Sequence, residues 1–370
     1  MVTIGHIVDV MEKIAPSCLA EEWDNIGLQV GHNAWPVDSI WVALDPTEKV
    51  VNKASQHGVN LLVTHHPLIF QPLSALNPET LIGRIIETAL REKLGIFCAH
   101  TNLDSARDGL NDMLSDALGI DNTNVLKPKK TEQYKMVVFV PKGHEGEVIN
   151  ALFESGAGKG GKYTHLSFRT EGMGTFKPGD TAKPFTGRRG EVTHASEYRI
   201  EVLVAKKDLP QVVAALHAVH PYEEVVYDLY GVGGGNSNDG LGRVGDVDKE
   251  ISLQRFAQRI KQVLGLETVR IVGNPKQTVR RVAVCSGSGK SLLADFLASD
   301  AQVFVSGDFG YHDGRHVEDS GRALIDIGHF ASEHLVVGGL VALLRENLSS
   351  RGYSVQVEPY EEERDCFQYI

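Results

Sequence analysis

The chain has 370 residues, of which 42% are hydrophobic and 23% are charged, and its formal net charge is −11 at pH 7. This length exceeds one ordinary hydrophobic core and predicts a globular protein of two or three domains. The acidic balance argues against a general nucleic-acid-binding protein, which needs a basic face. The sequence also contains no apolar stretch of the roughly 20 residues that a membrane span requires.

The N-terminal residues predict an amphipathic helix rather than a signal peptide. Apolar side chains recur at helical spacing between Ile4 and Ile14, with acidic residues among them. The four cysteines lie far apart without a C-x-x-C pair, so we expect free thiols in a reducing compartment. Together these features predict a cytoplasmic protein.

The first predicted domain, residues 1–130, alternates strand and helix patterns. In chain order these patterns lie at residues 40–44, 47–57, 59–63, 78–93, 96–99 and 109–118. Such a βαβ rhythm predicts a largely parallel sheet that is covered by helices.

The second predicted domain, residues 131–230, has a different pattern. Its strands and helices follow in the order βαβ–βαβ, at residues 134–140, 144–154, 164–169, 197–205, 209–219 and 225–230. This order is typical of a ferredoxin-like α+β sandwich. We expect a Gly/Pro-rich loop at about residues 171–192 and a flexible glycine-rich connector at residues 231–240.

The third predicted domain, residues 231–370, resumes the βαβ rhythm, with strands at 281–285, 303–305 and 323–327. The stretch CSGSGKS at residues 285–291 follows a strand and ends like a phosphate-binding P-loop. It has Val284 where that motif needs its first glycine, so we do not expect a nucleoside triphosphatase.

Three short apolar runs, each expected to be a buried strand, are followed directly by candidate metal ligands. The α/β enzymes gather their functional residues at the carboxyl ends of strands. Imidazole and carboxylate groups without thiolate suit zinc, iron and manganese. The candidates are His65, His66, Asp104, His329 and Glu333.

The spacing of these candidates indicates two metal ions. Adjacent side chains diverge on an extended backbone, so His65 and His66 fit two ions better than one. His329 and Glu333 are four residues apart and would share one face of a helix. The candidates lie on both sides of the middle segment in the sequence. A common site therefore requires the outer segments to fold together and residues 131–230 to be an inserted domain.

Further polar residues near the same strand ends are candidates for catalysis or positioning. His100 and His312 are the candidate general acids or bases. Asp45 and Asp308 each follow a strand and are candidates to line the same cleft. Hydrogen bonds within turns and loops are the alternative role for such residues.

Five motifs in the outer segments are specific: EEWDNIGLQVG, THHPLIF, AHTNLD, SGDFGYHD and DIGHFASE. They resemble those of the NGG-interacting-factor-three-like family, whose members often carry the name GTP cyclohydrolase type two homologue. The resemblance implies two similar α/β lobes, a di-metal core between them and a toroidal homohexamer. In the family pattern Glu333 bridges the ions, His66 and Asp104 bind one ion, and His65 and His329 bind the other.

The stretch HPYEEVVYDLY at residues 220–230 lies in the middle segment. Here the segment resembles the PII-like or CutA-like domain that is inserted in longer bacterial members of the family. The resemblance leaves two roles for this domain, binding of a ligand or gating of the central cavity.

Two functions are compatible with these features. The first is a hydrolase that depends on two divalent metal ions, with zinc expected before iron or manganese. It would act on a nucleotide-like, phosphoester or cyclic-amide substrate, and the resemblance alone implies GTP cyclohydrolase-type activity. The second is a non-enzymatic metal-binding, metal-delivery or regulatory protein that is gated by its PII-like domain. An open coordination position beside a polar pocket would favour the hydrolase.

Overall fold

The computed structural model describes residues 1–130, 133–232 and 236–368. The chain forms two compact units. Unit 1 consists of Met1–Lys129 and Asn238–Ile370, and unit 2 consists of Lys130–Ser237. The polypeptide therefore leaves unit 1 once and returns to it. Within the described residues, no helix combines the length and the apolar character needed to cross a bilayer.

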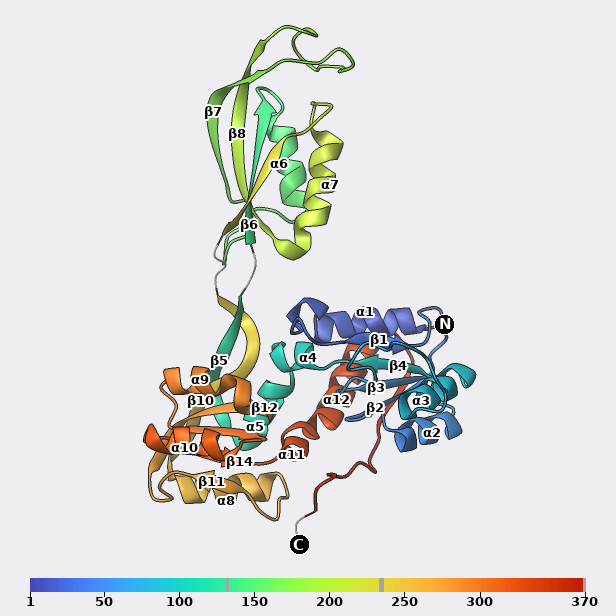
Figure 1. Cartoon of the computed structure of the whole chain (residues 1–370), viewed down its shortest axis with the longest axis vertical. Helices are drawn as coiled ribbons and strands as arrows, with labels where there is room; N and C mark the ends of the chain where they lie inside the picture. The colour runs from blue at the N-terminus through green and yellow to red at the C-terminus, as the bar shows by residue number, and fades with distance from the viewer. Residues whose placement is uncertain (131–132, 233–235, 369–370) are drawn as a thin grey trace. The chain divides into compact units, whose positions relative to one another are not determined.

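The first sheet of unit 1 has five strands in the order β1-β4-β3-β2-β15 (Figure 1). All neighbours are parallel except β1 and β4. Helices α1 and α12 pack on one face of this sheet, and α2 and α3 pack on the other. The elements are α1 (Ile4–Ile14), β1 (Gly27–Val30), β2 (Ser39–Ala43), α2 (Glu48–Gln56), β3 (Leu61–Thr64), α3 (Leu81–Arg91), β4 (Gly95–Cys98), α12 (Leu335–Ser350) and β15 (Gln356–Pro359).

The second sheet of unit 1 has six strands in the order β11-β14-β13-β12-β10-β5. Helices α5 and α8 cover one face, and α9 and α10 cover the other. The elements are α5 (Leu110–Leu118), β5 (Ile120–Lys130), β10 (Asn236–Ser252), α8 (Leu253–Val263), β11 (Arg270–Val272), β12 (Thr278–Ser288), α9 (Leu293–Ala298), β13 (Val303–Gly307), α10 (Tyr311–Asp319) and β14 (Ala323–Asp326). Two short helices, α4 (Thr101–Ser105) and α11 (His329–Glu333), follow β4 and β14.

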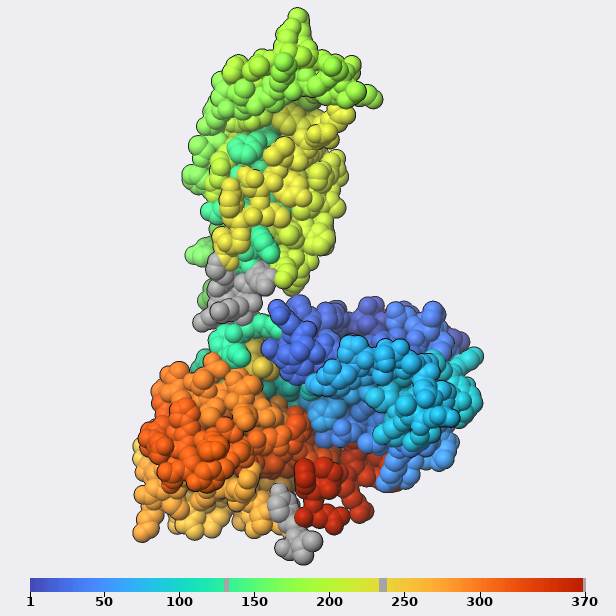
Figure 2. Space-filling view, viewed as in Figure 1, coloured from blue at the N-terminus to red at the C-terminus, as the bar shows by residue number. Residues whose placement is uncertain are grey.

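The outer segments of the chain exchange elements between the two sheets. The C-terminal strand β15 pairs in parallel with β2, and α12 shares a core with α1. Conversely, strand β5 of the N-terminal segment is part of the second sheet. Helix α5 of the same segment packs against that sheet. Figure 2 shows the blue surface of the early residues adjoining the red surface of the last ones. The predicted segments 1–130 and 231–370 therefore do not each correspond to one sheet.

Local chemistry explains where several predicted helices begin. The Thr47 side chain accepts a hydrogen bond from the Val50 backbone at 3.3 Å, which caps α2 at the start of the predicted segment 47–57. Thr80 accepts in the same way from Gly83 at 3.1 Å and begins α3. The amphipathic N-terminal helix is also confirmed, because Ile4, Ile7, Val10 and Met11 are buried along one face of α1.

Unit 2 contains a four-stranded sheet in the order β7-β8-β6-β9, with all neighbours antiparallel. Helices α6 and α7 share a hydrophobic core with one face of it. The element order β-α-β-β-α-β is that of a ferredoxin-like sandwich. The elements are β6 (Gln133–Pro141), α6 (Glu145–Glu154), β7 (Ser167–Phe176), β8 (Thr193–Ala205), α7 (Leu209–Val219) and β9 (Tyr227–Val232).

Two segments that were predicted as loop or connector are partly strand. Strand β7 continues to Phe176 because it pairs residue by residue with β8, up to Phe176 opposite Thr193. Cross-strand pairing thus outweighs the weak strand propensity of its glycines. Strand β10 begins at Asn236, inside the predicted connector, of which residues 233–235 lie outside the described part of the chain.

Candidate metal centre

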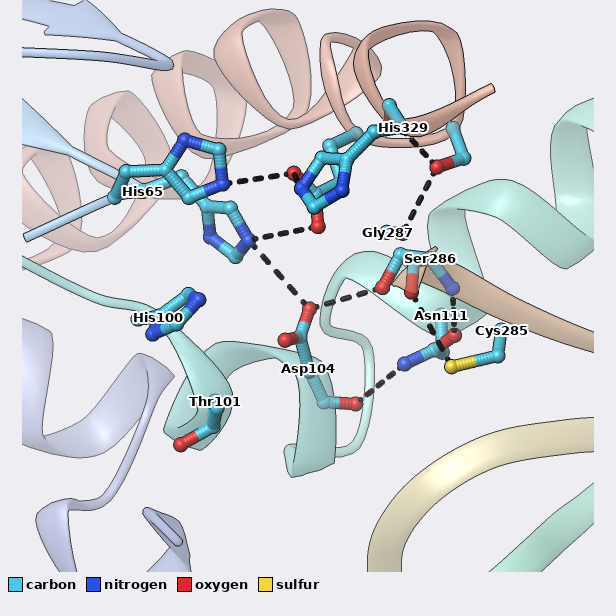
Figure 3. Close-up of polar contacts among 12 residues, drawn as sticks. His65, His100, Thr101, Asp104, Asn111, Cys285, Ser286, Gly287 and His329 are labelled. Carbon is cyan, nitrogen blue, oxygen red and sulfur yellow. Dashed lines mark hydrogen bonds and ion pairs between the residues drawn. The ribbon is translucent and has the colours of Figure 1, made fainter. Parts of the chain in front are cut away.

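The carboxyl ends of strands from both sheets of unit 1 meet at one centre (Figure 3). His65 and His66 follow β3, and Asp104 lies on α4 after β4. His329 and Glu333 are the first and last residues of α11, so the predicted helical pair at i and i+4 is confirmed. The structure therefore brings all five predicted ligands together from segments that are more than 200 residues apart in the sequence.

The Glu333 carboxylate occupies the middle of this centre. Its Oε2 lies 2.9 Å from Nε2 of His66 and 3.0 Å from Nε2 of His329. Its Oε1 lies 3.8 Å from Nε2 of His65, and that nitrogen is 3.7 Å from Oδ1 of Asp104. Glu333 is only 3% exposed, so its charge is shielded from solvent and is shared among three imidazoles.

These distances divide the ligands into two groups. His66, His329 and Glu333 place one ligand atom each within 4.8 Å of one another. His65 and Asp104 lie together on the Oε1 side of Glu333. The pairing that the resemblance implied, His66 with Asp104 and His65 with His329, differs from this arrangement. The reason is that the adjacent imidazoles diverge at the end of β3 toward opposite oxygens of one carboxylate.

Each of the three imidazoles is oriented through its other ring nitrogen. Nδ1 of His65 lies 2.9 Å from the carbonyl oxygen of Ala99. Nδ1 of His66 lies 2.8 Å from Asp45, and Nδ1 of His329 lies 2.7 Å from Asp308. These acceptors hold a proton on Nδ1, so Nε2 is the ring atom that faces the centre and can bind a metal ion.

The two Asp–His pairs are related by position in the fold. Asp45 follows β2 and its partner follows the neighbouring strand β3, while Asp308 follows β13 and its partner follows the neighbouring strand β14. The two sheets therefore supply equivalent pairs, and both imidazoles meet at the same oxygen of Glu333, Oε2. Asp45 thus orients the imidazole of His66, and Asp308 orients that of His329.

The donor set fits divalent cations. With Nδ1 protonated, each Nε2 faces a carboxylate oxygen, and the two atoms satisfy each other only when a proton or a metal ion lies between them. Nε2 of His65 and Oε2 of Glu333 are buried and have no hydrogen-bond partner among the described residues. Buried polar atoms of this kind are costly unless a partner is supplied. A cation between the imidazoles and the carboxylate satisfies both.

The cysteines near the centre do not add thiolate ligands. Cys98 and Cys285 are buried, and burial raises the pKa of both thiols well above the usual value. Both thiols therefore stay protonated at neutral pH. The available ligands are nitrogen and oxygen atoms, a set that is typical of zinc, iron and manganese sites.

Protons compete with metal for this centre. Burial lowers the pKa of His66, but Asp45 and Glu333 raise it more strongly, to about 10. Glu333 and then Asp308 raise the pKa of His329 to about 9. Burial raises the pKa of Glu333, yet the surrounding imidazoles hold it well below the usual value. In the metal-free protein both imidazoles are therefore protonated at neutral pH.

We expect metal affinity to rise with pH, because each bound proton on His66 and His329 must leave before Nε2 can bind a metal. The apparent association constant should increase about tenfold per pH unit for each proton released, up to the raised pKa values. Competition with a chelator of known affinity between pH 6 and pH 8 measures this slope. A slope of zero would contradict protonation of the metal-free imidazoles.

Four neighbouring residues that the sequence analysis did not single out as site residues support the ligands. Ser286 donates through Oγ to Asp104 at 3.0 Å, and its backbone N–H donates to Asn111 at 2.9 Å. Asn111 in turn donates to the Asp104 carbonyl oxygen. Gly287 donates to the Ser332 hydroxyl at 2.8 Å. Ser286 and Gly287 lie in the glycine-rich stretch at 285–291, whereas Asn111 and Ser332 left no sequence signal, because isolated asparagines and serines carry no pattern.

We expect Gly287→Ala to impair metal binding without changing a ligand. A Cβ atom at this position would lie 2.1 Å from Oε1 of Glu333, and φ of +58° is strained for alanine. The carboxylate would have to move, and metal affinity should fall at least about tenfold. Gly338→Ala on α12, where no atom lies within 4 Å of the added Cβ, is the control. Equal affinities of the two variants would show that the close approach is unimportant.

His100 lies beside the predicted ligands and has its own carboxylate partner. Its Nδ1 is 2.9 Å from Oδ1 of Asp24, and one of its nitrogens lies within 4.8 Å of ligand atoms of His65 and His66. Burial raises the pKa of Asp24, but hydrogen bonds from His100 and Thr101 outweigh it and lower the pKa to about 2. Asp24 therefore stays ionised and holds the His100 ring in place.

His312, the second predicted catalytic residue, is not brought to the centre. It is exposed at the start of α10, where its ring packs edge-on against Tyr311. Its side chain lines neither of the two cavities beside the centre. The helix turns this residue outward, although Asp308 of the same motif reaches His329.

Two cavities open beside the centre. One, of about 740 Å³, is lined by His66, His100, Asp104 and Glu333 together with Trp23, Phe70 and Lys290. The other, of about 780 Å³, is lined by His329, Asp45 and Asp308 together with Arg270 and Arg364. The centre is therefore accessible to small molecules, as a closed structural metal site would not be.

Comparison with known proteins places this chain in a family. The profile of Duf34/NIF3 (NGG1p interacting factor 3) matches residues 2–365. The chain is 38% identical over 365 residues to a GTP cyclohydrolase 1 type 2 homolog of Halalkalibacterium halodurans, with 98% of each chain covered. It is 37% identical to the Bacillus subtilis protein of that name, with 99% of this chain and 98% of the relative covered.

A solved structure agrees with these relatives. The crystal structure of a Bacillus cereus protein related to NIF3 matches with a TM-score of 0.80 and 37% identity, and all of both chains is covered. The mixed α/β fold is thus the fold of NIF3-related structures. Sequence and structure together show that this chain belongs to the Duf34/NIF3 family.

Proposed function

We propose that unit 1 is a di-metal hydrolase core in which the two sheets with their helices are two similar lobes. The observation that carries the proposal is a buried carboxylate, Glu333, that faces the Nε2 atoms of three imidazoles, each of which can bind a metal ion once its proton has left. His66, His329 and Oε2 of Glu333 would hold one ion. His65, Asp104 and Oε1 of Glu333 would hold the other.

Zinc is the metal that we propose first, with iron or manganese as alternatives, because the ligands are nitrogen and oxygen atoms. Two divalent ions at this centre would supply Lewis acidity for hydrolysis of a carbonyl or phosphoryl compound. The remaining contributions come from the protein. Asp45, Asp308 and the Ala99 carbonyl group hold the imidazole rings in place, and Ser286 holds Asp104.

The aromatic and basic side chains that line the cavity of about 740 Å³ support a nucleotide-like or phosphoester substrate. Trp23 and Phe70 lie 5.9 Å apart at its edge, and both rings are about half exposed. Such rings offer stacking surfaces to a planar base. Lys290, with Ser288 and Ser291, supplies an ammonium group and hydroxyl groups to the same cavity, as phosphate binding requires.

His100 is the residue that we propose for proton transfer. Asp24 binds its Nδ1, so its Nε2 is the atom that exchanges a proton with the substrate. His100→Gln should keep the metal content but lower kcat by about 10²- to 10⁴-fold. Loss of the metal in this variant would instead show that His100 is a metal ligand.

The test of the proposed function begins with elemental analysis of the purified protein. A hydrolysis screen with nucleotides, including GTP, with phosphoesters and with cyclic amides follows. Turnover that is lost with a chelator, restored by metal and reduced in His100→Gln would support the hydrolase. A metal-loaded protein that hydrolyses none of these compounds would support the alternative, a metal-binding, metal-delivery or regulatory protein.

We also propose that the chain assembles as a toroidal homohexamer and that unit 2 is a PII-like or CutA-like regulatory domain. The exposed apolar side chains Phe70, Leu73, Leu76 and Leu81 on unit 1 support self-association. The ferredoxin-like element order supports the assignment of unit 2. Light scattering should give the mass of six copies of the 40.4 kDa chain. The mass of a single chain would disprove the hexamer.

A further inference from the structure

Unit 2 contains a cavity of its own, of about 690 Å³. It lies between the sheet and the segments that follow β7 and α7. In Figure 1 the segment that joins β7 to β8 extends beyond the end of the four-stranded sheet. The cavity is lined by three aromatic and three acidic side chains, among other residues: Phe176, Phe185, Tyr222, Glu197, Glu223 and Glu224. A volume of this size suits a small organic molecule.

Glu197 is placed on the cavity side of the sheet. Side chains alternate along a strand, so Glu197 of β8 lies on the face opposite to Ile200 and Val202. Those two side chains belong to the core under α6 and α7. Glu197 is nevertheless only 7% exposed, because the segments that line the cavity cover it. Its Oε2 lies against Gly174, where a Cβ would come within 2.0 Å of it.

The charge of Glu197 is only partly compensated within the protein. Tyr222 donates its hydroxyl hydrogen to Oε1 at 2.6 Å. Burial and Glu197 raise the pKa of Tyr222, so this hydroxyl keeps its proton. Within the described part of the chain, Oε2 has no hydrogen-bond donor and no lysine or arginine forms an ion pair with Glu197. Glu197 lines the cavity without a cationic partner from the described residues, so a cation that binds in the cavity would pair with it.

The walls of the cavity favour an organic cation. The ring of Tyr222 lies 6.0 Å from that of Phe176 and 6.1 Å from that of Phe185. Aromatic faces attract ammonium groups, most strongly where water is excluded. Among the lining residues three glutamates face one basic side chain, Lys177, which is exposed. The cavity therefore has an excess of negative charge.

The same surroundings argue against an inorganic metal ion. His220 lies beside Tyr222, with ring centroids 5.1 Å apart, and both of its ring nitrogens are already used. Nε2 lies 3.0 Å from the Phe139 carbonyl oxygen, and Nδ1 accepts from the Tyr222 backbone at 3.1 Å. No histidine is among the described residues that line the cavity. Carboxylates among aromatic rings match an ammonium group better than a transition metal.

We propose that unit 2 binds a small organic cation, an amine or quaternary ammonium compound, between the ring faces of Phe176, Phe185 and Tyr222, with its charge on Glu197. This site is separate from the metal centre, because every residue that lines it belongs to unit 2. The binding site and the ligand class do not depend on whether unit 1 hydrolyses a substrate.

Titration of the full-length protein with choline, followed by ligand-observed NMR, tests the proposal. The uncharged isostere 3,3-dimethylbutan-1-ol has the same shape and should bind at least about tenfold more weakly. Glu197→Gln, which keeps the shape and an acceptor for Tyr222, should lower choline affinity about tenfold. Phe185→Ala should lower it severalfold, and this ring is half exposed, so the fold does not depend on it.

Glu147→Gln, an exposed carboxylate on α6 outside the cavity, is the matched control and should bind choline like the unaltered protein. Melting curves show whether each variant is folded. Equal binding of choline and its isostere would overturn the proposal in favour of a plain apolar pocket. Absence of choline binding at millimolar concentration, or an unchanged affinity in folded Glu197→Gln, would overturn it outright.

Discussion

Glu333→Gln is expected to remove most of the bound metal from the protein. A neutral amide cannot bridge two cations, and it leaves the three imidazoles without the anion that they share. Metal content, measured by elemental analysis after dialysis, should fall from about two ions per chain, the number in a two-metal site, to a small fraction of one. Of the five candidate ligands, Glu333 is the one that belongs to both groups.

Glu87→Gln, an exposed carboxylate on α3, is the matched control and should keep its metal. Circular dichroism should show that Glu333→Gln is folded, because the glutamine side chain has nearly the volume of the glutamate. A folded Glu333→Gln protein that still holds about two ions per chain would disprove the bridging role. Loss of one ion only would mean that Glu333 serves one group of ligands.

Arg243→Met is expected to cost unit 1 about 3–5 kcal/mol of its free energy of unfolding. Arg243 of β10 is 3% exposed, and it binds both carboxylate oxygens of Asp112 on α5 at 2.6 and 2.8 Å. Its other N–H groups donate to carbonyl oxygens of Gly240, Gly242 and Ala106. Methionine fills the space but leaves the carboxylate and three carbonyl groups without their donor.

Urea unfolding followed by tryptophan fluorescence measures this effect selectively. All three tryptophans of the chain lie in unit 1. Arg255→Met, at an exposed position on α8, is the control and should change the free energy of unfolding by less than about 0.5 kcal/mol. An Arg243→Met protein as stable as this control would show that the Arg243–Asp112 ion pair does not hold strand β10 to helix α5.

The candidate ligands were visible in the sequence because each one follows a short buried strand or lies one helical turn from another candidate. His65 and His66 follow an apolar run, and His329 and Glu333 have helical spacing. Such signals are local, since side-chain alternation and helical periodicity depend on neighbours in the chain. The same rules predicted the helix at α1.

Apart from Asp45 and Asp308, the residues that support the site were not visible in this way. Asp24 reaches His100 across 76 positions of the sequence, and Ser286 reaches Asp104 across 182. A single aspartate or serine has no periodic pattern, and only the assembled sheets bring these side chains together. For the same reason His312 looked equivalent to His100 in the sequence, although its helix turns it toward solvent.

The sequence by itself determined the alternation of strands and helices, the break in pattern between the outer and middle segments and the types of ligand, because these depend on hydrophobic periodicity and side-chain chemistry. Only the tertiary structure decided which strands pair. The C-terminal strand β15 joins β2, and β5 joins the second sheet. Strand pairing depends on the burial of both faces over long separations, which no local pattern encodes. The grouping of His65 with Asp104, and of His66 with His329, follows from that pairing.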